Sequence, residues 1–204
     1  KISVVGQRII MELNGYSCID IERVQKKKSI ISSKSFGYKV TEIQEIKEAV
    51  STYAARACEK LRDQKSRVQV ISVYLRTSPF EKEDSRYAKS ETEVLSTPTS
   101  STAKVITAAN KIIEEIYREG YRYQKTGITL LNLINEDYVQ ESLYEDGSLE
   151  GEEKITTVMD QVNMQYGTNT IFHASQGTKK DWRVKSDSRS KKYTTSLKEL
   201  PLVK

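Results

Sequence analysis

The chain has 204 residues, a formal net charge of +5 at pH 7, and 37% hydrophobic against 30% charged residues. No apolar run reaches the length of a membrane-spanning helix and no secretory signal pattern is present, so we expect a cytoplasmic protein with no membrane partner. Cys18 and Cys58 stand far apart without CxxC spacing, which indicates neither a disulfide framework nor a zinc site.

The first 28 residues divide into a helix and a linker. A helical pattern covers residues 1–14, and Gly15 is typical of the residue that follows such a helix. Because the chain lacks an initiator methionine and starts inside this pattern, we expect a piece of a longer protein. A polar, basic linker follows over residues 16–28, and "SIISSKSFG" then predicts a strand.

A long helix is predicted from Thr41. Thr41 and Gln44 match a capping box. Cys58 lies beside the apolar stripe of this helix and is expected to be a small buried hydrophobe rather than a reactive thiol. Apolar residues recur at helical spacing at Ile43, Ile46, Val50, Tyr53, Ala57 and Leu61.

Two further strands and a second helix follow. In "RVQVISVYLRTSPF" the apolar side chains of Ile71, Val73 and Leu75 alternate with polar ones that include Tyr74 and Arg76. "TEVLSTPT" predicts the next strand. The second helix covers about residues 101–119, and its apolar face consists of Val105, Ala109, Ile112 and Ile116.

"YRYQKTGITLLNLI" predicts a last strand. The order strand–helix–strand–strand–helix–strand is typical of the split β-α-β arrangement. We therefore predict an α+β fold in which a four-stranded antiparallel sheet carries two helices on one face. The other face would be open and would carry hydroxyls, tyrosines and arginines.

The last third of the chain is more polar. Eight acids and no lysine or arginine occur between Glu136 and Glu153, and residues 137–151 form an acidic connector. A third helix is expected over residues 152–166, and "NTIFHASQG" is strand-like. Residues 152–204 would thus make a small C-terminal α/β extension, whose basic end packs on the third helix or remains partly mobile. The side chains expected to point inward from the third helix are Ile155, Val158, Met159 and Val162.

The sequence offers no constellation typical of catalysis. His173 is the only histidine and has no identifiable serine or cysteine partner. Neither GxxxxGK[ST] nor GxGxxG is present. We therefore expect no catalytic residue, cofactor or metal site in this chain.

Binding to a nucleic-acid backbone fits the composition better. Such binding needs lysines, arginines and small hydroxyl residues along one surface. "SSKSFG", "YLRTSP", "DSRYAKS" and "YRYQKTG" each place these residue types at a strand or its end. The candidate DNA-binding residues are Ser33, Lys34, Ser35, Arg76, Thr77, Arg86, Lys89, Arg122 and Lys125.

Several motifs carry a family resemblance. "ELNGYSCIDIE", "SKSFGYKVTEIQEIKEAVSTYAARACEKLR", "LRTSPF", "YRYQKTGITLLNL" and the closing "YTTSLKELPLV" occur in this order. Together they resemble the C-terminal half of UmuC-type Y-family translesion DNA polymerases.

The resemblance implies a division of the chain. Residues 1–15 would be the end of the thumb, 29–136 the little-finger DNA-binding domain, and 152–204 the C-terminal extension. The palm and fingers, with carboxylates that hold magnesium, would belong to the parent polymerase and precede Lys1. The implied role is gripping damaged template–primer DNA during error-prone SOS repair and mutagenesis.

The acidic connector contains a candidate clamp-binding peptide. The resemblance implies that Gln140, Leu143 and Tyr144 dock on the sliding clamp, with the two apolar side chains as anchors. Glu141 and Tyr144 depart from the family pattern, in which an aliphatic residue and a phenylalanine are common. In the alternative interpretation, the two apolar residues pack locally on the domain.

Two other functions fit parts of the sequence. The chain could be a protein-interaction module that docks the polymerase onto a RecA-like recombinase filament or a UmuD-like accessory dimer without touching DNA. A split β-α-β fold can also bind RNA, but the RNP-type aromatic pair on adjacent central strands is missing.

Overall fold

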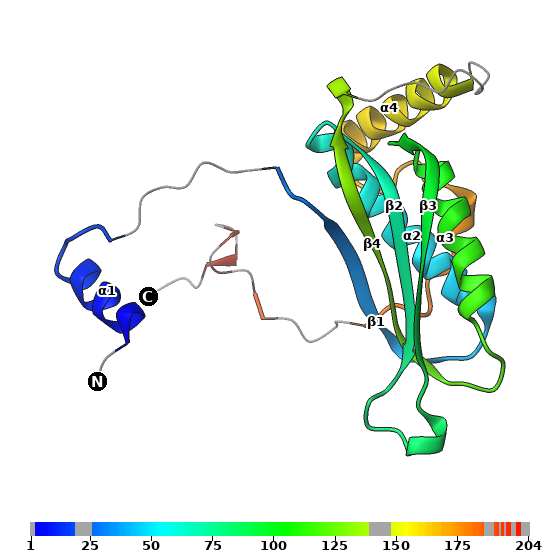
Figure 1. Cartoon of the computed structure of the whole chain (residues 1–204), viewed down its shortest axis with the longest axis horizontal. Helices are drawn as coiled ribbons and strands as arrows, with labels where there is room; N and C mark the ends of the chain where they lie inside the picture. The colour runs from blue at the N-terminus through cyan, green and yellow to red at the C-terminus, as the bar shows by residue number, and fades with distance from the viewer. Residues whose placement is uncertain are drawn as a thin grey trace.

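A four-stranded antiparallel sheet forms the centre of the molecule (Figure 1). Its strands are β1 (Ile30–Val40), β2 (Ser66–Thr77), β3 (Ala88–Thr99) and β4 (Tyr123–Asn135), in the order β1-β4-β2-β3. β1 and β2 run parallel with β4 inserted between them, which is the split β-α-β arrangement. The predicted α+β fold is confirmed. The computed structural model describes residues 3–18, 26–138, 148–185, 190–191, 193, 195–196 and 199–200.

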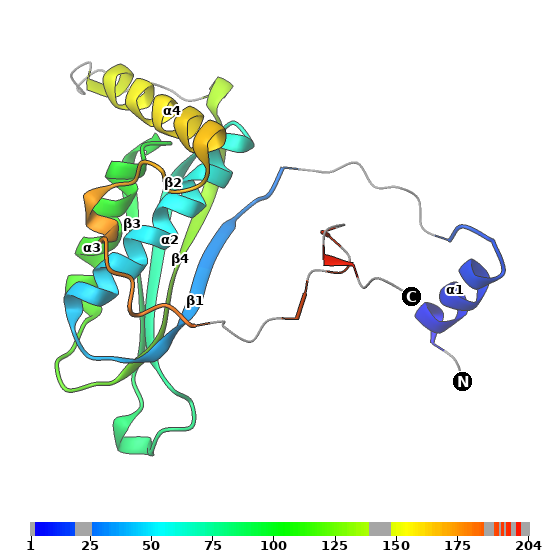
Figure 2. The same ribbon diagram turned by 180° about the vertical axis from the view of Figure 1, so that it is seen from behind.

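Two long helices cover one face of the sheet (Figures 1 and 2). They are α2 (Ile43–Asp63) and α3 (Thr102–Ile116). The apolar stripe predicted for α2 packs against the sheet, and Ile46, Tyr53 and Leu61 on it are at most 1% exposed. The side chains of each strand that point toward these two helices form the opposite side of this core.

The predicted capping box of α2 is wrong. The helix begins at Ile43 and its N-cap is Glu42, which makes no side-chain hydrogen bond to the backbone. Gln44 is therefore the second helical residue, one position short of the third position that a capping box needs. The Thr41 carbonyl accepts a hydrogen bond of 2.7 Å from the Tyr117 hydroxyl instead.

The N-terminal helix α1 (Val4–Leu13) is present as predicted. Ser3 caps it by accepting a hydrogen bond from the Gly6 amide, and Gly15 follows with φ of +87°. No helix in the described part of the chain is long and apolar enough to cross a bilayer.

The C-terminal extension contains α4 (Ser148–Tyr166) and a 3₁₀ turn (Ala174–Gln176), and residues 148–185 contain no strand. The strand predicted at "NTIFHASQG" is therefore wrong. The Asn163 side chain donates to the Ile171 carbonyl and accepts from the Ile171 amide, both at 2.9 Å. Because both backbone groups of Ile171 are satisfied within the extension, this segment folds back on α4 instead of extending.

The predicted inward face of α4 is wrong at its first two positions. Ile155 is 64% exposed and Val158 is 55% exposed. Asp160 instead receives hydrogen bonds of 2.6 and 2.8 Å from the Arg62 guanidinium on α2. Arg62 also donates to the Thr102 hydroxyl at the start of α3. The ion pair between Arg62 and Asp160 therefore holds α4 with its polar face toward the domain.

The segment after the 3₁₀ turn crosses the helix layer and reaches the edge of the sheet (Figure 2). Trp182 of this segment is 2% exposed. Its ring packs edge-on against the rings of Phe36 and Tyr53, with ring centroids 6.4 and 5.8 Å apart. The Gly37 amide of β1 donates to the Trp182 carbonyl at 2.8 Å. The described part of the basic end therefore packs on α2 and β1, whereas the sequence predicts either packing on the third helix or partial mobility.

Candidate nucleic-acid interface

The face of the sheet opposite α2 and α3 carries side chains in rows that run across the strands. One row contains Ser35, Lys125, Arg76 and Ala88, and these residues are neighbours in the strand register. The next rows contain Ser33, Gly127, Tyr74 and Ser90, followed by Ile31, Thr129, Ser72 and Thr92. We call this surface the open face.

Side chains from β1 and β2 approach Gly127 of β4 closely in the middle of the open face. A Cβ atom on Gly127 would lie 2.3 Å from the Ser33 Cβ and 2.8 Å from the Tyr74 ring. Only glycine leaves room for the Tyr74 ring to lie across β4 toward β1. The row next to Arg76 and Lys125 therefore carries an aromatic ring.

Arg76 and Lys125 give the open face its positive charge. They are direct neighbours across β2 and β4. Arg76 is exposed and Lys125 is half-buried. Neither forms an ion pair within the described ranges. Their donors can therefore reach an external anion such as a phosphate group.

Three of the nine candidate residues point to the other side of the sheet. Lys34 is paired in register with buried Thr126, and Lys89 with buried Leu75. Lys89 lies 3.2 Å from a Glu91 carboxylate oxygen. Thr77 is 4% exposed. Because side chains alternate along a strand, a lysine next to an outward serine must face inward.

The remaining two candidates lie at the end of the sheet where residues 78–87, the hairpin loop, join β2 to β3. The Arg86 Nε atom donates to the Glu81 carbonyl at 2.9 Å within the loop. Arg122 is exposed just before β4. A hydrogen bond from Lys39 holds the pKa of the Glu81 carboxyl below its usual range, and the charge of Arg122 contributes to this. Both arginines therefore lie near Glu81 in the hairpin loop.

The opposite end of the open face is apolar, which was not predicted from the sequence. Ile31 and Val94 are 61% and 67% exposed. Val94 is a neighbour of Val70 in register, and Val70 of Leu131, so these three form the row next to the one that contains Ile31. The signal was present in the alternation of β2, where Val70 shares a face with Tyr74. The open face is thus basic near the hairpin loop and apolar at its far end.

The side chains that could support other chemistry are buried or isolated. Cys58 is 0% exposed, so its expected place among the buried hydrophobes is confirmed, and burial raises the pKa of its thiol to about 12. Burial, and then the charge of Arg62, lower the pKa of half-buried His173. No group of three or more histidine, cysteine or acidic side chains in the described ranges could hold a metal ion. Gln140, Leu143 and Tyr144 lie outside the described residues.

Two family models match the chain. The model for the "impB/mucB/samB family C-terminal domain" matches residues 27–143. A "Domain of unknown function (DUF4113)" matches residues 153–203.

Relatives match over nearly the whole chain. Protein UmuC of Salmonella typhimurium is 37% identical over 99% of this chain and 48% of its own length. Protein ImpB of Salmonella typhimurium is 34% identical with the same coverage. DNA polymerase IV of Clostridium acetobutylicum is 28% identical over 83% of this chain. The chain spans about half the length of the curated relatives it matches.

Solved structures include DinB from Sulfolobus solfataricus, with a TM-score of 0.43 and 16% identity over 65% of this chain and 36% of that one. The little finger of PolIV, in a complex with the beta-clamp, has a TM-score of 0.39 and 16% identity over 57% of this chain and 99% of that one. The family match rests on the sequence, and the strand order defines the fold. The chain belongs to the impB/mucB/samB family, and the resemblance to the C-terminal half of UmuC-type proteins is confirmed.

Proposed function

We propose that this chain is the DNA-gripping part of an error-prone translesion DNA polymerase. The observation that carries the proposal is the row of Arg76 and Lys125 on the open face, with no ion pair to either among the described residues. Backbone contacts of this kind ignore base identity, and a polymerase on a damaged template needs such contacts. The sequence similarity to UmuC and to a DNA polymerase IV supports the polymerase class.

The chemistry of nucleotide transfer belongs to the longer protein in this proposal. Magnesium and its carboxylate ligands would lie in the palm, outside these residues. The parent protein would act in the cytoplasm during the SOS response, with a UmuD-like dimer and a RecA-like filament as partners. An isolated sample of this chain should therefore show no primer extension with any divalent metal.

A binding titration on variants of the open face tests the proposal. The Arg76→Ala/Lys125→Ala double variant should bind primed duplex DNA at least tenfold more weakly, since charge-assisted hydrogen bonds are worth about 1.5–3 kcal/mol each. Lys89→Ala is the matched control, because Lys89 lies on the other side of the sheet. Unchanged affinity in the double variant would favour the alternative, a protein-docking module without DNA contact.

The connector is the proposed docking point for the sliding clamp. Leu143 and Tyr144 would anchor the peptide, and Gln140 would bind the rim of the clamp pocket. Leu143→Ala/Tyr144→Ala should remove clamp binding while it changes the free energy of unfolding by less than roughly 0.5 kcal/mol per residue. Glu141→Leu should tighten clamp binding. A double alanine variant that binds the clamp normally would reject this peptide.

A further inference from the structure

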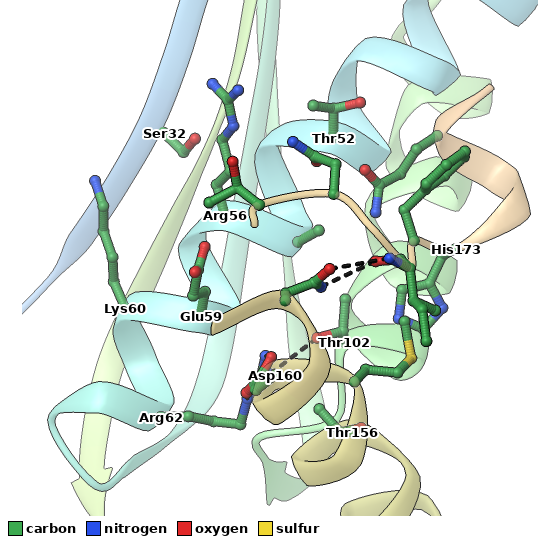
Figure 3. A pocket seen from close by; sticks show the side chains of 18 of the residues that line it. Ser32, Thr52, Arg56, Glu59, Lys60, Arg62, Thr102, Thr156, Asp160 and His173 are labelled. Atoms are coloured by element: carbon green, nitrogen blue, oxygen red, sulfur yellow. Dashed lines mark hydrogen bonds and ion pairs between the residues drawn. The ribbon is translucent and has the colours of Figure 1, made fainter. Parts of the chain in front are cut away.

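A cavity lies where the C-terminal extension meets α2 and β1, on the side of the sheet away from the open face. It has a volume of about 400 Å³. Its lining includes Lys34 of β1, Tyr53 and Arg56 of α2, and Trp182 and Arg183 of the extension. Lys34 and Arg56 also line a neighbouring cavity of about 490 Å³. Figure 3 shows Arg56, Glu59 and Lys60 of α2 around this neighbouring cavity.

Three residues that line the first cavity carry buried donor atoms that have no acceptor in the described chain. The Tyr53 hydroxyl, the Trp182 Nε1 and the Arg183 Nη2 atoms are buried and have no hydrogen-bond partner there. Tyr53 and Trp182 are 1% and 2% exposed. Each of these groups can donate a hydrogen bond, and a buried donor without an acceptor costs free energy. The cavity is thus lined by residues from two different parts of the sequence that carry donors without an acceptor.

Positive charges gather at the same place. Burial raises the pKa of Tyr53, and the charges of Arg56 and Arg183 oppose this increase. Burial lowers the pKa of Lys180, and the charges of the same two arginines lower it further. Burial and then the charge of Arg56 lower the pKa of Arg183. Within the described ranges, no ion pair neutralises Lys34, Arg56, Lys180 or Arg183. The acids nearby are Glu48 near Lys180, Asp181 next to it in the chain, and Glu59 in the neighbouring cavity. Three acids against four cations leave an excess of positive charge.

Cations that repel one another do not stabilise the fold by themselves. Several converging donors with excess positive charge suit an anion that accepts many hydrogen bonds at once, and a phosphate group does so. Lys34 connects the cavity to the open face, because it stands between Ser33 and Ser35, which point to that face. A strand of DNA that leaves the open face around the β1 edge would pass this cavity.

We propose that Lys34, Arg56, Trp182 and Arg183 form a second phosphate site, the seam site, for single-stranded DNA that turns around the β1 edge. The inference rests on the proposed function, since the strand is taken to come from the open face. It gives the C-terminal extension a role of its own: the extension supplies Trp182 and Arg183, and the little finger supplies Lys34 and Arg56.

The first test uses inorganic phosphate as the probe. At matched ionic strength, phosphate in place of chloride should raise the melting temperature of the chain and should not raise that of Arg56→Gln/Arg183→Gln. In chloride alone this variant should melt at or above the wild-type temperature, because a like-charge repulsion is removed. Arg8→Gln/Lys82→Gln is the control for loss of two charges, because both side chains are exposed and line neither cavity. A variant that melts several degrees lower in chloride would show that the two arginines serve the fold.

The second test compares blunt duplex DNA with primed DNA that carries a single-stranded overhang. The chain should prefer the overhang severalfold, and Arg56→Gln/Arg183→Gln should lose this preference. The salt slope of this variant should be lower by about 0.7 for each phosphate group that it no longer binds. Arg76→Ala/Lys125→Ala should weaken both DNAs alike.

The outcomes separate the two proposals. An overhang preference that survives in Arg56→Gln/Arg183→Gln overturns the seam site and leaves the open face intact. Unchanged binding in Arg76→Ala/Lys125→Ala overturns the open face. Stabilisation by phosphate without any overhang preference would mean a site for free phosphate, and tighter binding of polyglutamate than of the oligonucleotide would mean a peptide site. Either result rejects the DNA strand as the ligand.

Discussion

Replacing Gly37 with alanine should release the C-terminal segment from the sheet without unfolding the sheet. A Cβ atom at this position would lie 2.4 Å from the Arg183 carbonyl oxygen, 2.9 Å from its carbon and 3.2 Å from the Val184 Cα. These are backbone atoms, so the clash cannot be relieved by a change of rotamer. Gly37 has no positive φ, so alanine itself suits the strand.

The size of the effect follows from the contacts that must separate. Ordinary packing needs about 3.4 Å or more between such atoms, so the segment must move by roughly 1 Å. This movement breaks the 2.8 Å hydrogen bond from the Gly37 amide to the Trp182 carbonyl, which is worth about 1 kcal/mol. Overpacking adds roughly 1–3 kcal/mol. Docking should therefore weaken by about 2–4 kcal/mol, or roughly 30- to 900-fold.

Trp182 is the only tryptophan of the chain, so its fluorescence reports docking directly. Gly37→Ala should shift the emission to the red, and amide hydrogen exchange should accelerate over residues 172–185. Gly151→Ala is the matched control, because a Cβ atom at Gly151 has nothing within 4 Å. Emission and exchange identical to wild type in Gly37→Ala would refute the docked position of Trp182.

Three further changes probe the fold and the site. Arg62 and Asp160 should couple by about 1 kcal/mol in a double-mutant cycle of Arg62→Ala and Asp160→Asn, because the pair is bidentate but partly exposed; additive effects would contradict the anchor of α4. Gly127→Ala should cost roughly 1–3 kcal/mol in chemical denaturation, since its Cβ would overlap Ser33; a neutral effect would contradict the close approach of the strands. Burial, and then Arg62, lower the pKa of His173 in the folded chain. Its contribution to stability should therefore be complete above the unfolded value of about 6.5 and lost as the pH falls toward the lowered pKa. Thermal melts between about pH 7.5 and 5 should show this loss in wild type and not in His173→Asn, and equal pH dependence in both would reject it.

Local periodicity predicted the sheet and its helices because each element is amphipathic by itself. The alternation of Ile71, Val73 and Leu75 places these residues against the helices, and all three are buried. The same alternation explains why Lys34 and Lys89 face away from Arg76. A motif such as "SSKSFG" predicts one shared surface only if neighbours in sequence lie on the same side, whereas neighbours along a strand point to opposite sides.

The extension could not be predicted in the same way, because single contacts determine it. Arg62 orients α4 through Asp160, which lies 98 positions away in the chain, so the exposed Ile155 gave a misleading pattern. Trp182 stands alone among charged residues, and no period marks it as part of the core. Its partners Phe36 and Tyr53 belong to elements that are distant in sequence.

The salt dependence of DNA binding tests the central claim most directly. The affinity of the chain for primed duplex DNA should fall linearly with salt on a double logarithmic plot, without sequence preference. The slope of Arg76→Ala/Lys125→Ala should be lower by about 1.8, since each phosphate group that is no longer bound removes roughly 0.9. A wild-type affinity that does not change with salt, or a slope that is the same in the double variant, would contradict DNA binding by the open face.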